Sequence, residues 1–363
     1  MLRLPAFRFH RPGTLQEALT LLHDLGPEAR PVAGGTDLIP NLKHRLLEPT
    51  HLVSLTGIPE LGGIRLEGEA GGEGMGTGSG GGSGGGQIVL GAAVTLAALS
   101  RHPLVRQHLP ALAQAASQVA GPQIRSRGTV GGNLCLDTRC TYYNQTEFWR
   151  GALGYCLKKD GTVCHVTRVG RKCVAAHSAD TPPVLMTLGA VVDIAGPGGE
   201  RTVPVGDFFL PDGIWNQRRE PGELVVRIRV PLPHPTTRMA YRKLRQRRSI
   251  DFPLLSVAVS GEVEEDLTVR GLRGVVGALG ARPRELTGWE ELAVGERLGP
   301  ELIEALAERA HRQCHPLENI IVDPDWRRAM VPVFVRRALQ ALAGREPGKV
   351  GGDRWPPHAG GSV

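Results

Sequence analysis

Hydrophobic residues near the N-terminus repeat at intervals of three and four, which is the spacing of one helix face. Thr14 and Glu17 form a capping box in front of this face, so a helix is expected to follow them. The residues on the face are Leu15, Ala18, Leu19 and Leu22. Thr95 caps a later predicted helix, and residues 104–120 carry the pattern of one long amphipathic helix.

Short apolar or alternating runs, separated by Gly and Pro, predict strands before and after the middle of the chain. These runs cover residues 30–33, 51–55, 88–91, 190–195, 201–204 and 224–230. Asp180 or Thr181 is the expected N-cap of a helix that runs to Leu188. A Pro-rich segment after the last of these strands is typical of a linker and places a domain boundary near Pro233.

Beyond Pro233 the pattern changes from strands to helices. Strands are predicted at residues 239–244, 254–263, 268–273 and 275–279, and helices at 301–313 and 323–343. Strands followed by helices are typical of an α+β unit. We therefore expect a first domain over residues 1–232 and a second over 233–343. The Pro/Gly-rich tail at 344–363 is predicted to be disordered, and the Gly/Ser-rich segment 71–86 to be a flexible loop.

The chain has 43 Lys and Arg against 36 Asp and Glu, which gives a formal net charge of +7. The basic residues are scattered apart from a cluster at 242–248, and no nucleic-acid-binding motif accompanies that cluster. We therefore predict solvated arginines, or a surface that faces acidic partner subunits, and not a nucleic-acid binder. The sequence has no apolar run of about 18 residues and no signal peptide, so a cytoplasmic protein without a membrane span is expected.

Five of the six cysteines fall in one stretch, residues 134–178. Four of them follow the spacing C-x15-C-x7-C-x8-C, at Cys140, Cys156, Cys164 and Cys173. Zinc ribbons and fingers use tight C-x2-C pairs instead, whereas four thiolates are the ligand set of an iron–sulfur cluster. Aromatic residues are concentrated in the same stretch and would shield a cluster from water.

Other interpretations of these cysteines stay open on the spacing alone. Thiolate ligands suit zinc as well as iron–sulfur clusters. Disulfides are disfavoured, because reducing compartments do not keep them. Buried thiols without a ligand are a further alternative, since free Cys often packs as a small core residue. Cys314, which stands apart from the others, is interpreted as structural.

Two glycine-rich motifs are candidate binding loops. Ala33–Leu38 (AGGTDL) follows a predicted strand, and Thr129–Asn133 (TVGGN) follows the long predicted helix. In each motif glycines allow close approach of the backbone, and amide and hydroxyl groups can hold an anion. Two such loops in one domain can grip the two phosphates of a dinucleotide, although neither has the G-x-G-x-x-G spacing of a Rossmann fold. Ordinary glycine turns remain the alternative.

Together with the later YRK…RR…D pattern of Tyr241–Asp251, the two motifs resemble the FAD-binding subunit of the molybdenum hydroxylases. That family includes xanthine dehydrogenase and carbon monoxide dehydrogenase, and the resemblance extends over residues 4–340. It implies an α+β fold with two parts. The first is a two-part FAD-binding domain of the xanthine dehydrogenase/vanillyl-alcohol oxidase type, and the second is a C-terminal α+β domain, a sheet with packed helices.

Between the second glycine motif and the helix at Asp180, the chain carries residues that most members of the family lack, at about 136–177. This segment is called the cysteine insert below. It resembles the insert in the β subunit of 4-hydroxybenzoyl-CoA reductase, which binds an additional 4Fe-4S cluster. The ligands that the resemblance implies are Cys140, Cys156, Cys164 and Cys173. It gives no such role to Cys135, interpreted as a core thiol, or to His165, interpreted as structural.

The resemblance also implies which residues contact FAD. The first glycine motif would wrap the pyrophosphate with main-chain amides, and the second would hold it from the other side. Asp180 would contact the adenosine part, Lys243 would lie near the flavin, and Val119 would be an apolar contact. The expected FAD-binding residues are Pro31, Val32, Ala33, Gly34, Gly35, Thr36, Asp37, Leu38, Val119, Thr129, Gly131, Gly132, Asn133, Asp180 and Lys243.

The implied function is an electron relay among the 4Fe-4S cluster, FAD and the 2Fe-2S centres of a small subunit, in a complex with a large molybdenum-cofactor subunit. The complex would be a dimer of heterotrimers with ferredoxin as its electron donor. It would convert 4-hydroxybenzoyl-CoA to benzoyl-CoA by dehydroxylation. The chain itself would then need no catalytic acid, base or nucleophile. The alternatives are the FAD subunit of a molybdenum hydroxylase with another substrate, such as a purine or another aromatic compound, and a stand-alone flavin or iron–sulfur sensor module.

Overall fold

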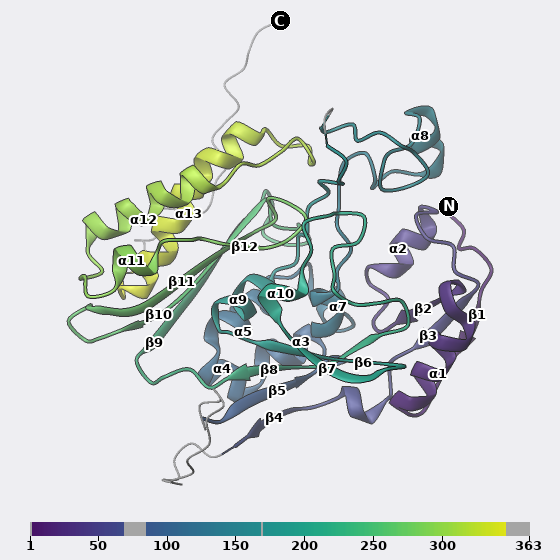
Figure 1. The fold of residues 1–363 in the computed structure, drawn as a ribbon, viewed down its shortest axis with the longest axis horizontal. Coiled ribbons are helices and arrows are strands. Elements are labelled where there is room, and N and C mark those ends of the chain that lie inside the picture. Colours follow the sequence, from purple (N-terminus) through teal and green to yellow (C-terminus); the bar gives the residue numbers. More distant parts are fainter. Residues whose placement is uncertain (1, 69–84, 168–169, 346–363) are drawn as a thin grey trace, which may run out of the picture.

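The computed structural model describes residues 2–68, 85–167 and 170–345 of the chain. Three separate sheets organise these residues, and the cysteine insert lies apart from all three (Figure 1). Nearly all of the predicted Gly/Ser loop at 71–86 and of the predicted tail at 344–363 lies outside the described residues.

The N-terminal sheet is parallel, in the order β1-β3-β2, and α1 and α2 pack against it. Its elements are β1 (Arg8–His10), α1 (Leu15–Leu25), η1 (Gly26–Glu28), β2 (Ala29–Val32), α2 (Leu38–Lys43), β3 (His51–Ser54) and η2 (Pro59–Leu61). The predicted first helix is confirmed: Thr14 accepts a hydrogen bond from the Glu17 amide at 3.2 Å, and the predicted face is turned inward.

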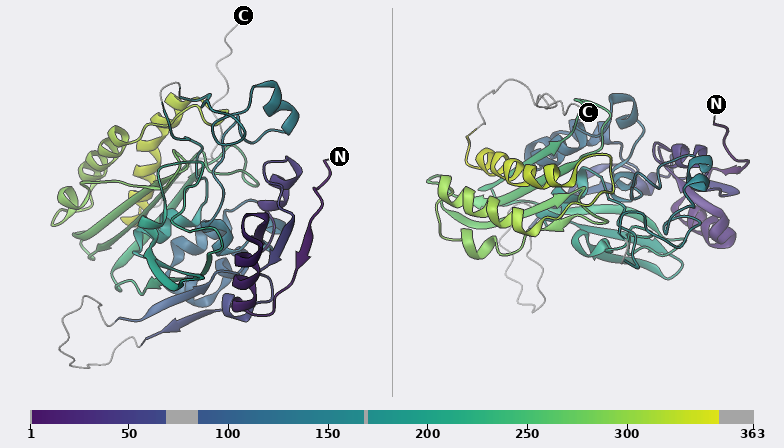
Figure 2. Two further views of the ribbon diagram at one scale, coloured as in Figure 1. Left: turned by 45° about the vertical axis from the view of Figure 1, so that its right-hand side comes forward. Right: turned by 90° about the horizontal axis from the view of Figure 1, so that it is seen from above.

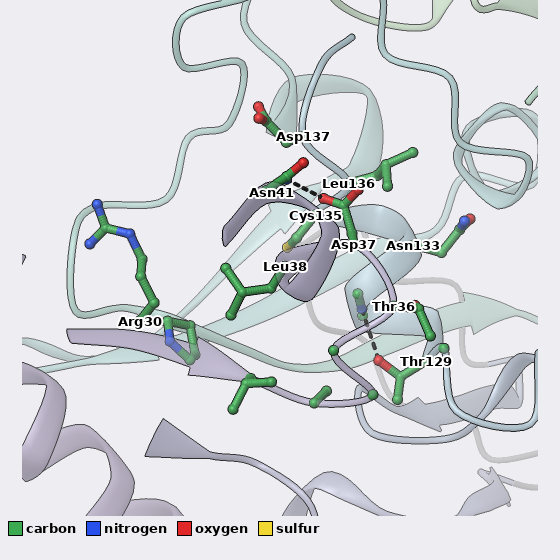
Figure 3. A pocket seen from close by; sticks show the side chains of 18 of the residues that line it. Arg30, Thr36, Asp37, Leu38, Asn41, Thr129, Asn133, Cys135, Leu136 and Asp137 are labelled. Carbon is green, nitrogen blue, oxygen red and sulfur yellow. Dashed lines mark hydrogen bonds between the residues drawn. The ribbon is translucent and has the colours of Figure 1, made fainter. Parts of the chain in front are cut away.

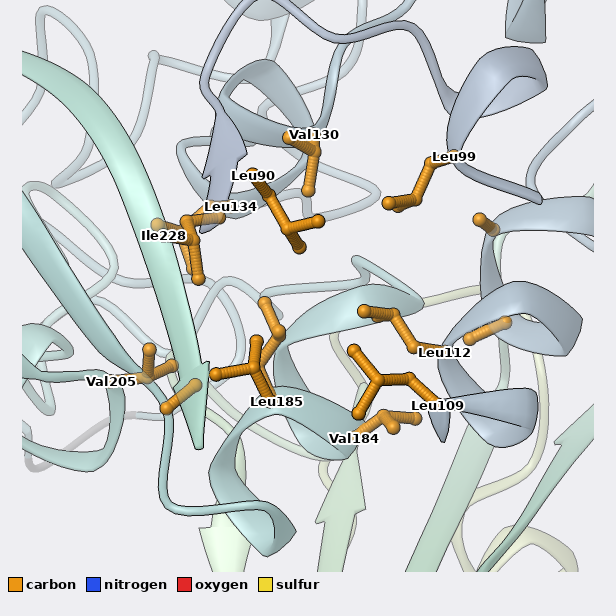
Figure 4. Packing of buried hydrophobic residues seen from close by; sticks show 14 of the residues in the cluster. Leu90, Leu99, Leu109, Leu112, Val130, Leu134, Val184, Leu185, Val205 and Ile228 are labelled. Carbon is orange, nitrogen blue, oxygen red and sulfur yellow. The ribbon is translucent and has the colours of Figure 1, made fainter. Parts of the chain in front are cut away.

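A five-stranded antiparallel sheet, in the order β4-β5-β8-β6-β7, carries the main hydrophobic core. Its strands are β4 (Ile64–Glu67), β5 (Gln87–Gly91), β6 (Val191–Gly196), β7 (Gly199–Pro204) and β8 (Leu224–Pro231). The accompanying helices are α3 (Leu96–Arg101), α4 (Pro103–His108), α5 (Pro110–Ser117), α6 (Pro122–Arg125), α7 (Val130–Leu134), α9 (Thr181–Thr187) and α10 (Val205–Phe208). Figure 4 shows Leu112 of α5, Leu185 of α9 and Ile228 of β8 meeting in this core.

Three predicted elements, one helix and two strands, are wrong in their extent. The single helix expected over residues 104–120 is broken into α4 and α5, because Pro110 has no N–H to continue the helix and begins a new one. The two strands expected at 268–273 and 275–279 form one continuous strand, β11, which passes through Gly274 without a turn.

The C-terminal sheet is antiparallel, in the order β12-β11-β10-β9. Its elements are β9 (Thr237–Leu244), β10 (Leu255–Val263), β11 (Val269–Gly277), β12 (Arg284–Glu285), α11 (Glu290–Ala293), α12 (Pro300–Gln313) and α13 (Pro324–Leu342). The long helices α12 and α13 pack side by side along this sheet (Figure 2), while α5 and α9 of the preceding domain also contact its strands. The predicted order of strands and then helices is confirmed.

Among its described residues, 136–167 and 170–177, the cysteine insert contains one short helix, α8 (Glu147–Ala152), and is otherwise irregular. The sequence pattern predicts no element in it. In Figure 1 the insert lies above the N-terminal unit, with α8 over α2, and reaches toward the end of the C-terminal domain. Within the described residues, no helix has the length and apolar character needed to cross a membrane.

Candidate functional site

The first glycine motif touches the backbone that leads into the second motif. A Cβ atom built on Gly34 would lie 1.9 Å from the main-chain oxygen of Arg127, just before the second motif. No side chain fits at this contact, so Gly34 is required for the two loops to touch. Gly35 has a φ of +68°, a left-handed conformation that glycine adopts without strain.

The second motif is the N-cap and start of the helix α7, and not a loop. Thr129 is its N-cap, and the Thr129 hydroxyl accepts a hydrogen bond from the Gly132 amide at 3.0 Å. A Cβ atom on Gly131 would lie 2.8 Å from both the Cβ and the carbonyl oxygen of Ala92. Gly131 therefore lets α7 pack directly on the chain that leaves β5.

Between the two motifs lies a cavity of about 530 Å³, called the central cavity below (Figure 3). Thirteen of the fifteen expected FAD-binding residues line it. They are Pro31, Val32, Ala33, Gly34, Gly35, Thr36, Asp37, Leu38, Val119, Thr129, Gly131, Gly132 and Asn133. This volume is in the range of cofactor sites, and glycine loops with apolar walls fit a dinucleotide with a planar ring system.

The side chain of Asn133, at the edge of the central cavity, also connects two helices. Its Oδ1 atom accepts hydrogen bonds from the Thr181 amide at 3.1 Å and from the Thr181 hydroxyl at 2.7 Å. Asn133 thereby ties α7 to the first turn of α9. The position of the second motif is thus fixed by a helix that follows the cysteine insert in the sequence.

The remaining two expected residues, Asp180 and Lys243, do not line the central cavity and form a buried network behind it. Asp180 accepts hydrogen bonds from Tyr241 at 2.6 Å and from Lys243 at 3.0 Å, and Lys243 also donates to the carbonyl of Gln118 at 2.9 Å. Burial raises the pKa of Asp180 and lowers the pKa of Lys243, and the charge of each partner opposes this change. Since Gln118 precedes Val119, the network braces one wall of the central cavity. A direct contact of Asp180 or Lys243 with FAD stays a prediction.

The cysteine insert contributes to the central cavity, which the sequence motifs did not predict. Tyr143, Lys158 and Lys159 line it, together with residues from the N-terminal loops. Arg139 forms an ion pair with Asp37 of the first glycine motif, and its guanidinium lies 4.9 Å from the ring centre of Phe252. Short motifs carry no signal for such contacts, because the partners are far apart in the sequence.

Cys135, expected to be a core thiol, has a mixed position. It packs against the main hydrophobic core and also lines the central cavity. Burial raises the pKa of its thiol, which favours the neutral form. Cys314 lies in the core of the C-terminal domain, as expected of a structural residue.

Three of the four insert cysteines pack in one small buried core. Its members are Leu46, Cys140, Tyr143, Cys156, Cys173 and Ala175. Burial raises the pKa of the Cys140 thiol, and the nearby thiols of Cys156 and Cys164 add to this rise. Burial also raises the pKa of Cys173 to about 11, with Cys140 and Cys164 again contributing. Cys140 is therefore a neighbour of Cys156 and Cys164, and Cys173 is a neighbour of Cys140 and Cys164.

All six cysteines of the chain are free thiols. Within the described residues, no three or more His, Cys, Asp or Glu side chains form a group that could hold a metal ion. His165 lies beside the thiols, with its Nε2 atom 2.5 Å from the carbonyl oxygen of Tyr155 and its ring 5.1 Å from that of Tyr142.

Long-range hydrogen bonds fix the insert on two sides. The buried Arg150 of α8 donates to the carbonyls of His44 at 3.2 Å and Arg45 at 2.9 Å, where α2 ends. On the other side, Asn319 donates to the carbonyl of Val174 at 2.7 Å.

The same Asn319 accepts a hydrogen bond on its main-chain oxygen from the Thr141 amide at 2.8 Å. Thr141 and Val174 each follow one of the insert cysteines. The C-terminal domain, through Asn319, therefore holds the chain beside Cys140 and Cys173.

Two protein-family models match the two domains of the chain. Residues 5–233 match the family model of the FAD-binding domain in molybdopterin dehydrogenase, and residues 239–342 match that of the CO dehydrogenase flavoprotein C-terminal domain. The carbon monoxide dehydrogenase medium chain of Hydrogenophaga pseudoflava is 31% identical over 341 residues, which cover 94% of this chain and 98% of that one. The aldehyde oxidoreductase FAD-binding subunit PaoB of Escherichia coli is 33% identical over 265 residues, 70% of this chain and 77% of that one.

A solved structure shares the fold as well. Carbon monoxide dehydrogenase from Hydrogenophaga pseudoflava, in a form lacking the Mo-pyranopterin moiety, superposes with a TM-score of 0.73 at 30% identity, covering 94% of this chain and 99% of that one. The predicted fold, a FAD-binding domain followed by a C-terminal α+β domain, is thereby confirmed. With FAD as its cofactor, the chain belongs to the FAD-binding medium subunits of the molybdenum hydroxylase family, of the CO dehydrogenase and xanthine dehydrogenase type.

Proposed function

We propose that this chain relays electrons between FAD in the central cavity and an additional 4Fe-4S cluster held by four cysteines of the insert. The ligands would be Cys140, Cys156, Cys164 and Cys173. FAD supplies the exchange between one-electron and two-electron steps, and the protein supplies orientation and electrostatics. The observation that carries the proposal is the packing of three of these thiols, those of Cys140, Cys156 and Cys173, in one small core beside the wall of the central cavity.

Metal analysis separates a cluster from a zinc ion. A zinc site would give zinc without acid-labile sulfide, whereas a 4Fe-4S cluster gives both iron and sulfide.

The two proposed sites share a wall. Leu46 and Tyr143 pack in the same small core as three of the cysteines, and both also line the central cavity. Only a few side chains therefore separate the thiols from the cavity. Such proximity is what an electron relay requires, and a merely structural use of the thiols does not require it.

The chain would act within a complex. We propose a large molybdenum-cofactor subunit and a small 2Fe-2S subunit as partners, arranged as a dimer of heterotrimers. A relative that is named a medium chain supports partners of larger and smaller size. The cysteine insert favours the 4-hydroxybenzoyl-CoA reductase type, with ferredoxin as electron donor and dehydroxylation to benzoyl-CoA on the large subunit. The residue contacts to FAD expected from the glycine motifs, the domain division near Pro233 and a cytoplasmic location belong to the same proposal.

A second candidate is the FAD subunit of a molybdenum hydroxylase with a different substrate. The similarity to carbon monoxide dehydrogenase medium chains over nearly the whole chain favours it. In this case the insert thiols would be structural, and the chain would carry flavin without iron. The iron content therefore separates the two candidates.

The test is a determination of iron, acid-labile sulfide and flavin on the isolated full chain, prepared without oxygen. The proposal expects about four iron and four sulfide per FAD. The variant Cys156→Ser should lose this iron, while Cys314→Ser, which changes a buried cysteine in the C-terminal core, should keep it. Flavin without iron in the wild type, or equal iron in both variants, would refute the cluster.

A further inference from the structure

Lys158 carries a charge that is buried between the insert cysteines and the central cavity. Its side chain is only 4% exposed. The ammonium donates to Asp137 at 2.7 Å, to the carbonyls of Gly213 at 2.7 Å and Thr138 at 3.1 Å, and to the Thr138 hydroxyl. It also lies 4.5 Å from the ring centre of Tyr143. An ammonium with this many fixed acceptors is held in one place.

On one side, Lys158 is linked to the cysteines. Gly213, which accepts its hydrogen bond, donates its own amide to the carbonyl of Cys173 at 2.8 Å. A Cβ atom on Gly213 would lie 3.0 Å from the sulfur of Cys173, so the chain that holds the ammonium touches this thiol. Lys158 also follows Cys156 by two residues.

On the other side, Lys158 faces the cofactor site. Lys158, its partner Asp137 and the Tyr143 ring all line the central cavity. Tyr143 donates to the second carboxylate oxygen of Asp137 at 3.0 Å, so the carboxylate is fixed as well. The pair therefore presents a positive charge next to the chain of Cys173 and a negative charge at the cavity wall.

We infer that Lys158 is an electrostatic tuning residue, which stabilises the reduced cluster in the insert and so raises its reduction potential. The inference rests on the proposed function, because it requires the cluster. An electron that arrives at a cluster adds negative charge, and a cation fixed nearby in a poorly solvated site lowers the energy of that state. Asp137 acts in the opposite sense, since its carboxylate offsets the ammonium. The two residues thus set the cluster potential by opposing charges.

The test is a redox titration of the loaded full chain, followed by EPR and visible absorbance, in three variants. Lys158→Met removes the cation and is expected to shift the cluster couple to lower potential. Asp137→Asn removes the opposing anion and is expected to shift it to higher potential. Lys158→Arg keeps the charge and is expected to stay nearest to the wild type. A purely structural role would not produce shifts of opposite sign.

Iron and FAD are determined in the same samples. If Lys158→Met does not retain iron, the other two variants decide the question. The cluster potential of Asp137→Asn should then lie above that of Lys158→Arg, and the potential of Lys158→Arg should lie near that of the wild type. Shifts in the same direction, or an unchanged potential in Asp137→Asn with full iron, would overturn the role of Lys158 and leave the cluster standing. A wild type without iron would overturn both.

Discussion

The central cavity and the cysteine insert are built in different ways. The cavity depends on two short motifs, and the main chain and glycines carry the geometry. The described part of the insert has one short helix, and a few residues hold it. Arg150 bonds to the end of α2 through its side chain, and Asn319 bonds beside Cys173 through its side chain and beside Cys140 through its main chain. One site follows from local sequence, and the other from long-range hydrogen bonds.

This difference teaches where each site is vulnerable. The backbone contact at Gly34 leaves no room for added atoms, so FAD binding should weaken when a single carbon atom is added there. Side-chain contacts can be removed one at a time, so the insert should weaken stepwise. The sites are nevertheless joined, because Arg139 pairs with Asp37, and Tyr143 and Lys158 line the cavity. Some loss of FAD is therefore expected when the insert is disturbed.

The largest effect is expected for Gly34→Ala. The added carbon would lie 1.9 Å from the Arg127 carbonyl, and a backbone atom cannot rotate away. Overpacking of this kind costs about 1–3 kcal/mol, so FAD affinity should fall roughly tenfold to hundredfold. Flavin fluorescence titration of the apoprotein measures it.

Gly271→Ala is the matched control, because a Cβ atom on Gly271, a residue of β11, meets nothing within 4 Å. It should bind FAD as the wild type does. Unchanged FAD affinity in Gly34→Ala would show that the loops can separate without harm, and the distinction between the two sites would lose its basis.

The same distinction explains what the sequence could predict. The glycine motifs are contiguous, and thirteen of fifteen expected residues line one cavity. Asp180 and Lys243 do not line the cavity and bond to each other beside its wall, and their contact with FAD stays a prediction. The role of the insert as part of the cavity wall depends on folded contacts such as Arg139 with Asp37, which no local pattern encodes. Pro110 marks the break between α4 and α5, but the helical periodicity of the residues around it predicted one continuous helix.

The next effect in size is expected for Asn319→Ala, which removes the hydrogen bond to the Val174 carbonyl beside Cys173. Leaving this half-buried carbonyl without its partner costs about 1 kcal/mol. Part of this cost should appear as looser attachment of the insert, so a chelator should remove iron up to about fivefold faster. Iron release is followed by absorbance, and FAD content should change little.

Ser260→Ala is the control for Asn319→Ala. Ser260 donates to the carbonyl of Thr187 at 2.8 Å, which also joins the C-terminal sheet to the preceding domain, but away from the cysteines. It should lose comparable stability without faster iron release. Equal rates of iron release in the two variants would mean that Asn319 acts only through general stability.

The last effect, which is absent at neutral pH, concerns the acid sensitivity of the C-terminal end of the insert. His177 is fully buried against Phe209, and burial, helped by the Lys158 ammonium, lowers the pKa of His177 to about 4. A histidine with a lowered folded pKa binds its proton better when unfolded, so its contribution to stability is present above pH 6.5 and is lost as pH falls toward 4. The free energy of unfolding should drop by about 2 kcal/mol between pH 7 and pH 5 from this group.

Burial raises the pKa of Asp37 and Asp180, which act in the opposite sense, so the comparison must be with His177→Met at each pH. Denaturant unfolding should show a shallower acid loss in the variant, and parallel pH profiles would mean that His177 is protonated in the folded chain.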